Sequence, residues 1–393
     1  MSKLILITNP GSASRKYALY QDKTPVVTLH FEYEGSRIVC SLKDIAMGTE
    51  KNLRPDIDDL GDTVPALRKI LETEKYITVD TPLSAVVVRV ASPGEYFTTD
   101  HIVDDECLAE LEKAKTKAPL HVPVAAAEIN HFRRSFSTVP IITVSDSAFH
   151  ASRPNLMKYY PFDTDLADKA EIKRYGFHGL SLGYVTELMK KKEILPEKLV
   201  ICHIGSGASV TAVFNGTSMD TSMGYSPLEG LMMSTRSGSI DTAAALAIKH
   251  ELKLSDDELE KYLNKKAGLL GVSGVSDDMR DILQKRDEGD PKSTFAHALY
   301  IYRVQSLIGQ MSASLGGIDA IVFTATIGER SDKVRHSVMQ KLAYLGFSID
   351  QAKNTAKNLP STTNIATEDS KPIYVIKTDE TAEMIRRASS LIK

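Results

Sequence analysis

The chain has 393 residues, of which 42% are hydrophobic, and a net charge of −3. This length predicts two domains. The slightly negative net charge gives no electrostatic reason to expect binding to nucleic acid or to a membrane surface. No segment approaches the roughly 20 apolar residues of a membrane span, and the first apolar run, which lacks a cleavage site, is interpreted as a strand and not a signal peptide. Three dispersed cysteines, Cys40, Cys107 and Cys202, exclude a Cys-based zinc cluster and favour a reducing compartment, so we expect a cytoplasmic protein.

Apolar runs and helical periodicity alternate through the first half of the chain. Strands are predicted at residues 3–8, 26–33, 37–42, 84–90 and 141–144, and helices at 64–74, 107–115 and 122–136. Arg89 is unusual because it lies within an apolar run, where a charge is costly unless it meets a counter-ion. Since Ser92, Pro93 and Gly94 turn the chain immediately afterwards, we expect Arg89 at the strand end, where a counter-ion can reach it.

The same patterns continue through the second half. Strands are predicted at residues 199–202, 209–214, 320–325 and 373–377, and helices at 179–192, 240–252, 256–266, 293–315 and beyond residue 380. Ser276 is predicted to be a helix N-cap, with Asp277 and Asp278 in the first turn.

Residues 201–241 form a long Gly, Ser, Thr and Met segment that contains one arginine, Arg236, and almost no Lys or Glu. Small residues with free backbone N–H groups, together with a fixed guanidinium, are suited to holding a multiply charged anion. The start of this segment also has a counterpart near the start of the chain. LILITNPGSASRKYALY and LVICHIGSGASVTAVFN share an apolar strand, a Gly-Ser loop and a second strand-like run, which suggests a duplicated domain.

Phosphoryl transfer needs cations, backbone N–H donors and a magnesium site around the moving group. The candidates in this sequence are Arg89, His121, Asp146, His178, His203, Arg236 and Glu380. Neither a GxxxxGK[ST] loop nor the HRD and DFG motifs of protein kinases are present. Structural roles are the alternatives: plain turns for the Gly-Ser loops, a structural ion pair for Arg89, a helix N-cap for Asp146, and core positions for His121, His203, Met232 and Met233. The residues alone therefore predict a two-domain α/β protein with an anion-binding cleft.

Several motifs carry a resemblance that extends over almost the whole chain. They are NPGSASRK, APLHVP, RYGFHG, CHIGSGAS, MDTSMGYSPLEGLMMSTRSGSID, GLLGVSGVSDDMRD, DAIVFTATIGE and TDE. In these motifs the chain resembles the acetate kinase family of acetate and propionate kinases. The resemblance implies an α/β fold of two duplicated actin-like, sugar-kinase-like (ribonuclease H-like) domains flanking a central cleft. Residues 1–148 with about 380–393 would form the domain on the acyl-substrate side, and residues 149–379 the nucleotide-binding domain and dimerisation region.

The activity that the resemblance implies is reversible transfer of a phosphoryl group from ATP to acetate, which gives acetyl phosphate and ADP by direct in-line attack. A short carboxylate and a nucleotide would be the substrates, Mg²⁺ (with Mn²⁺ as an alternative) the metal, and a homodimer the assembly. Carried over by position, the implied catalytic residues are Arg89, His121, Asp146, His178 and Arg236. The acyl group would contact Arg89, Ala91, Leu120, Phe177 and Pro227. Nucleotide binding falls to Ser12, Ser14, Lys16, His203, Gly205, Ser206, Gly207, Asp278, Met279, Arg280, Thr326, Ile327 and Gly328, and metal binding to Asn9 and Glu380.

The sequence also departs from the family pattern at several of these loops. Ala13 replaces a serine hydroxyl, Val90-Ala91-Ser92-Pro93-Gly94 replaces Val-Val-His-Gly-Gly, and Ser206 replaces an asparagine. Ala91 leaves room for one or two more carbons, so propionate or a larger acyl group is an alternative substrate. Thr326 replaces a glycine that allows close approach of the nucleotide, and Arg330 replaces an amide. Thr326 and Arg330 leave open a donor such as pyrophosphate, and the changes at Ser92, Ser206 and Thr326 leave open a catalytically weakened homologue that binds ligands.

Overall fold

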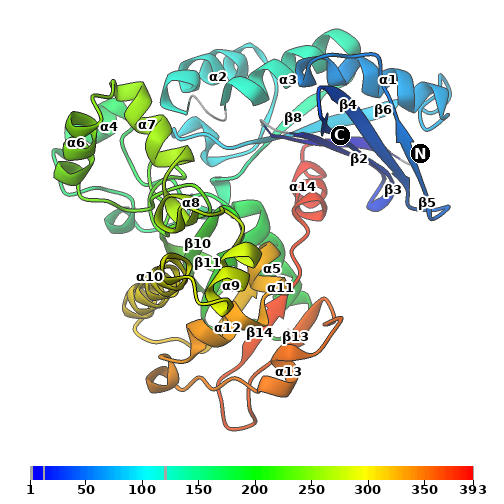
Figure 1. Ribbon diagram of the computed structural model, residues 1–393. Coiled ribbons are helices and arrows are strands. Elements are labelled where there is room, and N and C mark those ends of the chain that lie inside the picture. Colours follow the sequence, from blue (N-terminus) through cyan, green and yellow to red (C-terminus); the bar gives the residue numbers. More distant parts are fainter. Residues whose placement is uncertain (1–2, 12–13, 119–121, 393) are drawn as a thin grey trace. The chain divides into compact units, whose positions relative to one another are not determined.

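The computed structural model describes residues 3–11, 14–118 and 122–392, which form two compact units (Figure 1). Unit 1 comprises Met1–Ala148 with Asp379–Lys393, and unit 2 comprises Phe149–Thr378. Three residues with implied roles, Ser12, Leu120 and His121, lie outside the described residues. The helices of the described part of the chain include none that is long and apolar enough to traverse a lipid bilayer.

Unit 1 is built on an eight-stranded sheet in the order β5-β4-β3-β2-β1-β6-β8-β7. Its strands are β1 (Leu4–Pro10), β2 (Ser14–Gln21), β3 (Thr24–Glu34), β4 (Arg37–Asp44), β5 (Thr49–Leu53), β6 (Leu83–Val90), β7 (His101–Ile102) and β8 (Ile141–Ser145). Its helices are α1 (Thr63–Thr73), α2 (Asp105–Lys117), α3 (Val122–Ser135) and α14 (Glu380–Ala388). Helices α3 and α14 both contact β1, β6 and β8, from opposite faces of the sheet (Figure 1). The central strands are therefore covered on both sides, which explains their continuous apolar sequence.

Unit 2 contains a six-stranded sheet in the order β11-β10-β9-β12-β14-β13. Its strands are β9 (Lys198–Ile204), β10 (Ala208–Phe214), β11 (Thr217–Thr221), β12 (Ala320–Thr324), β13 (Thr362–Asn364) and β14 (Ile373–Ile376). Its helices are α4 (Thr164–Ala170), α5 (Gly179–Lys191), α6 (Thr242–Glu251), α7 (Asp256–Lys265), α8 (Gly268–Ser273), α9 (Met279–Asp287), α10 (Pro291–Leu315), α11 (Ala325–Arg330), α12 (Asp332–Met339) and α13 (Gln351–Thr355).

The two sheets share one topology. The order β3-β2-β1-β6-β8 in unit 1 matches β11-β10-β9-β12-β14 in unit 2. In both sheets the first three strands in sequence form an antiparallel meander, and two parallel strands follow on the other side of the first one. The predicted duplication of a strand–loop–strand unit is therefore confirmed, since both copies, β1–β2 and β9–β10, occupy the same place in their sheets.

Two local predictions need correction. The N-cap of α9 is Asp278 and not Ser276, because the Asp278 side chain accepts the hydrogen bond from the backbone N–H of Arg280 at 2.8 Å. Ser276 instead accepts a bond from the backbone N–H of Asp278 at 3.1 Å, within the turn that precedes the helix. The strand predicted at residues 320–325 stops at Thr324, since Ala325 adopts a left-handed backbone with φ of 64° and begins α11.

Candidate active site

A charged cluster lies at the carboxyl ends of the parallel strands of unit 1. The Nη2 atom of Arg89, near the end of β6, donates to Oδ2 of Asp146 at 2.8 Å, and Nη1 donates to Oδ1 of Asn9 at 3.1 Å. Glu380, the first residue of α14, places Oε2 3.9 Å from Nη1 of Arg89 and 3.5 Å from Nδ2 of Asn9. The expectation that Arg89 sits at a strand end with a counter-ion is confirmed, and the cluster joins residues more than 300 positions apart.

The charges of this cluster depend on one another. Asp146 is 1% exposed, and a carboxylate so buried is strongly destabilised unless a cation pairs with it. Burial acts to lower the pKa of Arg89, but the carboxylates of Asp146 and Glu380 outweigh it, so that pKa is raised and the guanidinium stays charged. Burial raises the pKa of Glu380, and Arg89 opposes that shift. Removing Arg89 would therefore leave the buried carboxylate of Asp146 without its guanidinium counter-ion.

Asp146 is held by a support that sequence reasoning missed. Asp100 accepts the backbone N–H of Ser145 at 2.8 Å, directly before Asp146. Arg387, in the last turn of α14, donates its Nε to the other oxygen of Asp100 at 2.8 Å and also contacts the first oxygen through Nη2. One end of α14 thus supplies Glu380 and the other end braces the strand that leads into Asp146.

The β1–β2 hairpin carries two more of the residues implied for nucleotide binding. Ser14 begins β2, and its carbonyl accepts the backbone N–H of Gly11 at 3.1 Å. Lys16 is exposed and lies opposite Asn9 in the antiparallel register. Its positive charge also acts on Glu380, so the hairpin adds a cation to the charged cluster.

The corresponding loop of unit 2 brings an imidazole and a guanidinium together. A Cβ atom on Gly207 would lie 3.2 Å from Nε2 of His178 and 3.6 Å from Nη1 of Arg236. Both nitrogen atoms therefore face the loop between β9 and β10, whose glycine leaves space beside them. The sequence predicts that the Gly-rich segment and Arg236 hold an anion, and the structure places the guanidinium of Arg236 at this loop together with an imidazole.

His178 is oriented through several contacts. It precedes α5 with a left-handed φ of 63°, its Nδ1 lies 2.9 Å from Oγ of Ser209, and its ring stacks on that of His203 with centroids 4.0 Å apart. His203 in turn lies 2.9 Å, through Nδ1, from Oγ of Ser181 on α5. Because Nδ1 of His178 contacts the hydroxyl of Ser209, the other ring nitrogen, Nε2, is directed towards the Gly207 loop.

Arg236 is fixed by the backbone around it. Its carbonyl accepts the N–H of Met233 at 3.0 Å, and its Nη1 lies 3.8 Å from the sulfur of Met233. Gly268 passes so close that a Cβ there would lie 2.8 Å from the Arg236 carbonyl. Met232 and Met233 are 3% and 0% exposed, so their predicted core positions are confirmed.

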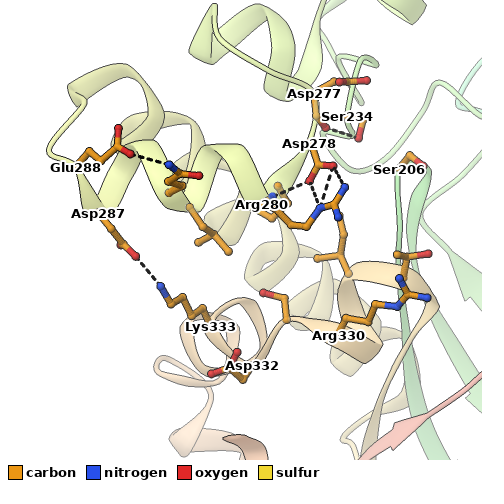
Figure 2. A pocket seen from close by; sticks show the side chains of 16 residues that line it. Ser206, Ser234, Asp277, Asp278, Arg280, Asp287, Glu288, Arg330, Asp332 and Lys333 are labelled. Carbon is orange, nitrogen blue, oxygen red and sulfur yellow. Dashed lines mark hydrogen bonds and ion pairs between the residues drawn. The ribbon is translucent and has the colours of Figure 1, made fainter. Parts of the chain in front are cut away.

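A cavity of about 850 Å³ opens beside the loop between β9 and β10 in unit 2 (Figure 2). Its volume lies within the range usual for small-molecule and cofactor sites. It is lined by Ser206, Ser234, Asp277, Asp278, Met279, Arg280, Leu283, Gln284, Asp287, Glu288, Thr326, Ile327, Arg330, Ser331, Asp332 and Lys333. Six of the residues implied for nucleotide binding are in this set. Gly328 is not, because it packs against Ile204 and Phe323.

The cations of this cavity differ in their pairing. Figure 2 shows Arg280 hydrogen-bonded to Asp278 and Lys333 to Asp287, and the two pairs measure 2.6 and 2.5 Å. Arg330 forms no ion pair with any described residue, and it lies with Ser206 at the end away from Asp287 and Glu288 (Figure 2). That end of the cavity therefore carries an uncompensated positive charge.

The residues implied for acyl binding belong to different units. Ala91 follows β6 in unit 1, whereas Phe177 and Pro227 belong to unit 2. Phe177 is 2% exposed and Pro227 is half-buried. The structure does not bring these residues together within one unit, and Leu120 lies outside the described residues.

Similarity to known proteins decides the family. A family model described as the acetokinase family matches residues 4–387. The chain belongs to the acetokinase family. An acetate kinase of Clostridium botulinum strain Okra is 39% identical to it over 383 residues, which cover 96% of each chain.

Two solved structures resemble this acetokinase-family chain over nearly all of its length. A propionate kinase from Francisella tularensis superposes with a TM-score of 0.90 at 32% identity and covers 98% of each chain. The Porphyromonas gingivalis acetate kinase superposes with a TM-score of 0.87 at 30% identity and covers 99% of each chain. The predicted fold class is therefore confirmed, and the chain is a phosphotransferase that uses a carboxyl group as acceptor.

Proposed function

We propose that this enzyme transfers the γ-phosphoryl group of ATP to acetate, reversibly and with Mg²⁺, to give acetyl phosphate and ADP. The observation that carries the proposal is the convergence of His178 Nε2 and Arg236 Nη1 on Gly207, next to a cavity large enough for a nucleotide. Fixed donors of this kind stabilise the charge on the oxygens of a phosphoryl group in transit.

The chemistry requires no protein nucleophile. A carboxylate oxygen of acetate attacks the γ-phosphorus in line, the new P–O bond forms as the bond to ADP breaks, and ADP leaves with the electron pair. Acetate is already ionised near neutral pH, so no general base is needed. Arg236 and His178 would neutralise the transferring group, and Arg89, kept charged by Asp146, would orient the acetate carboxylate.

The metal would lie beside the charged cluster of unit 1. Among the described residues, no group of three or more His, Cys, Asp or Glu side chains is arranged to hold an ion. Mg²⁺ commonly takes one or two protein oxygens and completes its shell with phosphates and water. The carboxylate of Glu380 and the side-chain oxygen of Asn9, whose amide nitrogen lies 3.5 Å from Oε2 of Glu380, would be those oxygens. When bound, Mg²⁺ supplies charge neutralisation to the phosphates of the nucleotide.

Two observations support a nucleotide as the donor over pyrophosphate. The cavity retains about 850 Å³ although Thr326 lines it, and Thr326 itself is exposed. Arg330, which has no ion-pair partner among the residues that the structure describes, lies at the end of the cavity with Ser206 (Figure 2). Ser206 belongs to the loop that we assign to the phosphates. Pyrophosphate would leave most of this space unfilled.

Acetate is proposed as the acceptor, with propionate as the second candidate. Ala91 offers more room than a valine, and a propionate kinase is among the structural relatives. We also propose that the enzyme is cytoplasmic and forms a homodimer. Leu246 and Leu252, in and just after α6, and Phe162 and Leu166, near and in α4, are large exposed apolar residues, as expected where a second copy covers them. Light scattering behind a sizing column would test the dimer.

An acyl-phosphate trapping assay tests the activity. ATP, GTP and pyrophosphate are each combined with acetate, propionate and butyrate, and hydroxylamine converts any acyl phosphate to a hydroxamate that is measured by colour. We expect the highest kcat/KM with ATP and acetate. Folded protein that gives no product with any donor would overturn the proposal, and tight nucleotide binding by calorimetry without turnover would favour a ligand-binding homologue instead.

A further inference from the structure

A buried histidine, His150, contacts the residue that precedes His178 in the chain. His150 is 1% exposed and ends a short 3-10 helix, Ala148–His150. Its Nε2 lies 2.9 Å from the carbonyl oxygen of Phe177, and its Nδ1 lies 2.8 Å from Oγ of Ser218. A carbonyl oxygen only accepts hydrogen bonds, so Nε2 must carry the proton in this arrangement.

The contact between His150 and Phe177 bears on the backbone of the next residue. His178 has a left-handed φ of 63°, a conformation that is uncommon for residues other than glycine and must be held by its surroundings. The Phe177 carbonyl belongs to the peptide unit that enters His178. Fixing that carbonyl therefore fixes the plane of the peptide from which the His178 side chain departs.

The rest of the segment is clamped around the same ring. A Cβ atom on Gly176 would lie 2.6 Å from Cδ2 of His150, so only glycine allows the backbone to pass this close. The backbone N–H groups of Tyr175 and Gly176 both donate to the carbonyl of Gly224, at 3.0 and 3.2 Å. Arg153 also donates to the carbonyls of Tyr175 and of His150, at 2.9 and 3.2 Å. Residues 174–177 thus rest on a buried polar support, in which His150 contacts the residue nearest to His178.

We propose that His150 is a positioning residue for His178: its Nε2–H bond to Phe177 holds the left-handed turn that directs Nε2 of His178 at the Gly207 loop. The proposal rests on the phosphoryl-transfer role proposed for His178. His150 itself touches no substrate. Its loss would misplace a catalytic group without removing it, so kcat should fall while the KM values for acetate and ATP change little.

Two amide substitutions separate this role from simple packing. In His150→Gln the amide group sits as far along the side chain as Nε2 and can keep the bond to Phe177. In His150→Asn it reaches only the position of Nδ1 and can keep the contact with Ser218 alone. We expect His150→Gln to retain kcat within about threefold and His150→Asn to lose about 10- to 100-fold, with both KM values within about twofold of those of the unsubstituted enzyme. The matched control is His297→Gln, because His297 is also buried, at 7% exposure, and is not part of this support.

The outcomes are distinguishable. If the unsubstituted enzyme makes no acyl phosphate, the proposed function fails and not this inference. If that enzyme is active and His150→Asn matches His150→Gln or His297→Gln in kcat, the positioning role is overturned. Should His150→Asn not fold, nitrogen-15 NMR of the imidazoles in the unsubstituted enzyme still decides, with the His150 signals assigned by their loss in His150→Gln. The Nε2–H tautomer is expected, and a proton on Nδ1 alone would overturn the proposal.

Discussion

The two units hold their functional groups by different physical means. In unit 1, Arg89, Asp146 and Glu380 form a cluster of opposite charges at the ends of parallel strands. In unit 2, His178 is oriented by a hydroxyl group and a stacked ring, beside a glycine loop. Ion pairs fix a guanidinium firmly because removing either partner is costly. A hydroxyl group can hold an imidazole in place whether the ring is neutral or protonated. This suits a group whose ligand changes its charge during the reaction.

Replacing Arg236 by Ala should have the largest effect, because Arg236 supplies the guanidinium that faces the Gly207 loop together with His178. We expect kcat to fall about 10³-fold or more, in line with the loss of a guanidinium that stabilises a transferring phosphoryl group. Steady-state kinetics and the circular dichroism spectrum are to be compared with those of Arg303→Ala, an exposed arginine on α10. A near-normal kcat in Arg236→Ala would contradict the assigned role.

Glu380→Gln should break the unit 1 cluster more selectively. An amide keeps the shape but removes a charge that would hold Mg²⁺ and that faces Arg89 at 3.9 Å. We expect kcat/KM to fall about 100-fold at fixed Mg²⁺ and the Mg²⁺ concentration for half-maximal rate to rise. Glu383→Gln, on the same helix but paired with Arg386, is the control. An unchanged Mg²⁺ dependence in Glu380→Gln would exclude Glu380 as a metal ligand.

His297 offers a test of how unit 2 tolerates buried charge. Burial lowers the pKa of His297 to about 4, and Arg286 adds to the shift. The unfolded chain therefore binds the proton at higher pH than the folded protein, and this contribution to stability is lost as pH falls from about 6.5 towards 4. Between pH 7 and pH 5 we expect a loss of about 2 kcal/mol that is absent in His297→Gln. Urea unfolding followed at both pH values measures it, and an equal pH effect in both proteins would contradict it.

Thr326→Gly should have the smallest effect. The cavity is already open with threonine present, so replacing Thr326 by glycine should change the KM for ATP less than about threefold. An effect of this size corresponds to the small free-energy change that is usual for a substitution at the surface. Initial rates at varied ATP and pyrophosphate measure it. A large fall in the KM for ATP would mean that Thr326 obstructs the nucleotide in the unsubstituted enzyme. That result would support pyrophosphate as the donor.

Some of this organisation is readable from local sequence because it has a local signature. Arg89 stands out as a charge in an apolar run, and Asp146 follows a strand directly. The repeated strand–loop–strand pattern correctly indicated the duplicated topology. The N-cap of α9 was misplaced because two neighbouring residues, Ser276 and Asp278, both have cap-forming side chains, and only the fold decides which one meets a free N–H group.

The supporting residues have no such signature. Asp100 and Arg387 are separated by 287 positions, and nothing near either one indicates the other. Glu128 reads as an ordinary helix residue, yet it is 2% exposed and accepts a bond from Tyr17 at 2.6 Å and another from Thr8 at 3.1 Å. His150 is likewise buried, and nothing in its local sequence indicates its contacts with Phe177 and Ser218. Such contacts arise only when segments that are remote in sequence are packed together.

The placement of α14 has a consequence for biosynthesis. Helix α14 covers β1, β6 and β8 of unit 1 but follows the whole of unit 2 in the chain. At about 5–20 residues per second, translation of unit 2 takes on the order of tens of seconds. Throughout that interval the nascent unit 1 exposes one face of its central strands on the ribosome and lacks Glu380. We therefore expect that the emerging first unit depends on chaperones, and that the site of unit 1 matures only when the final helix docks.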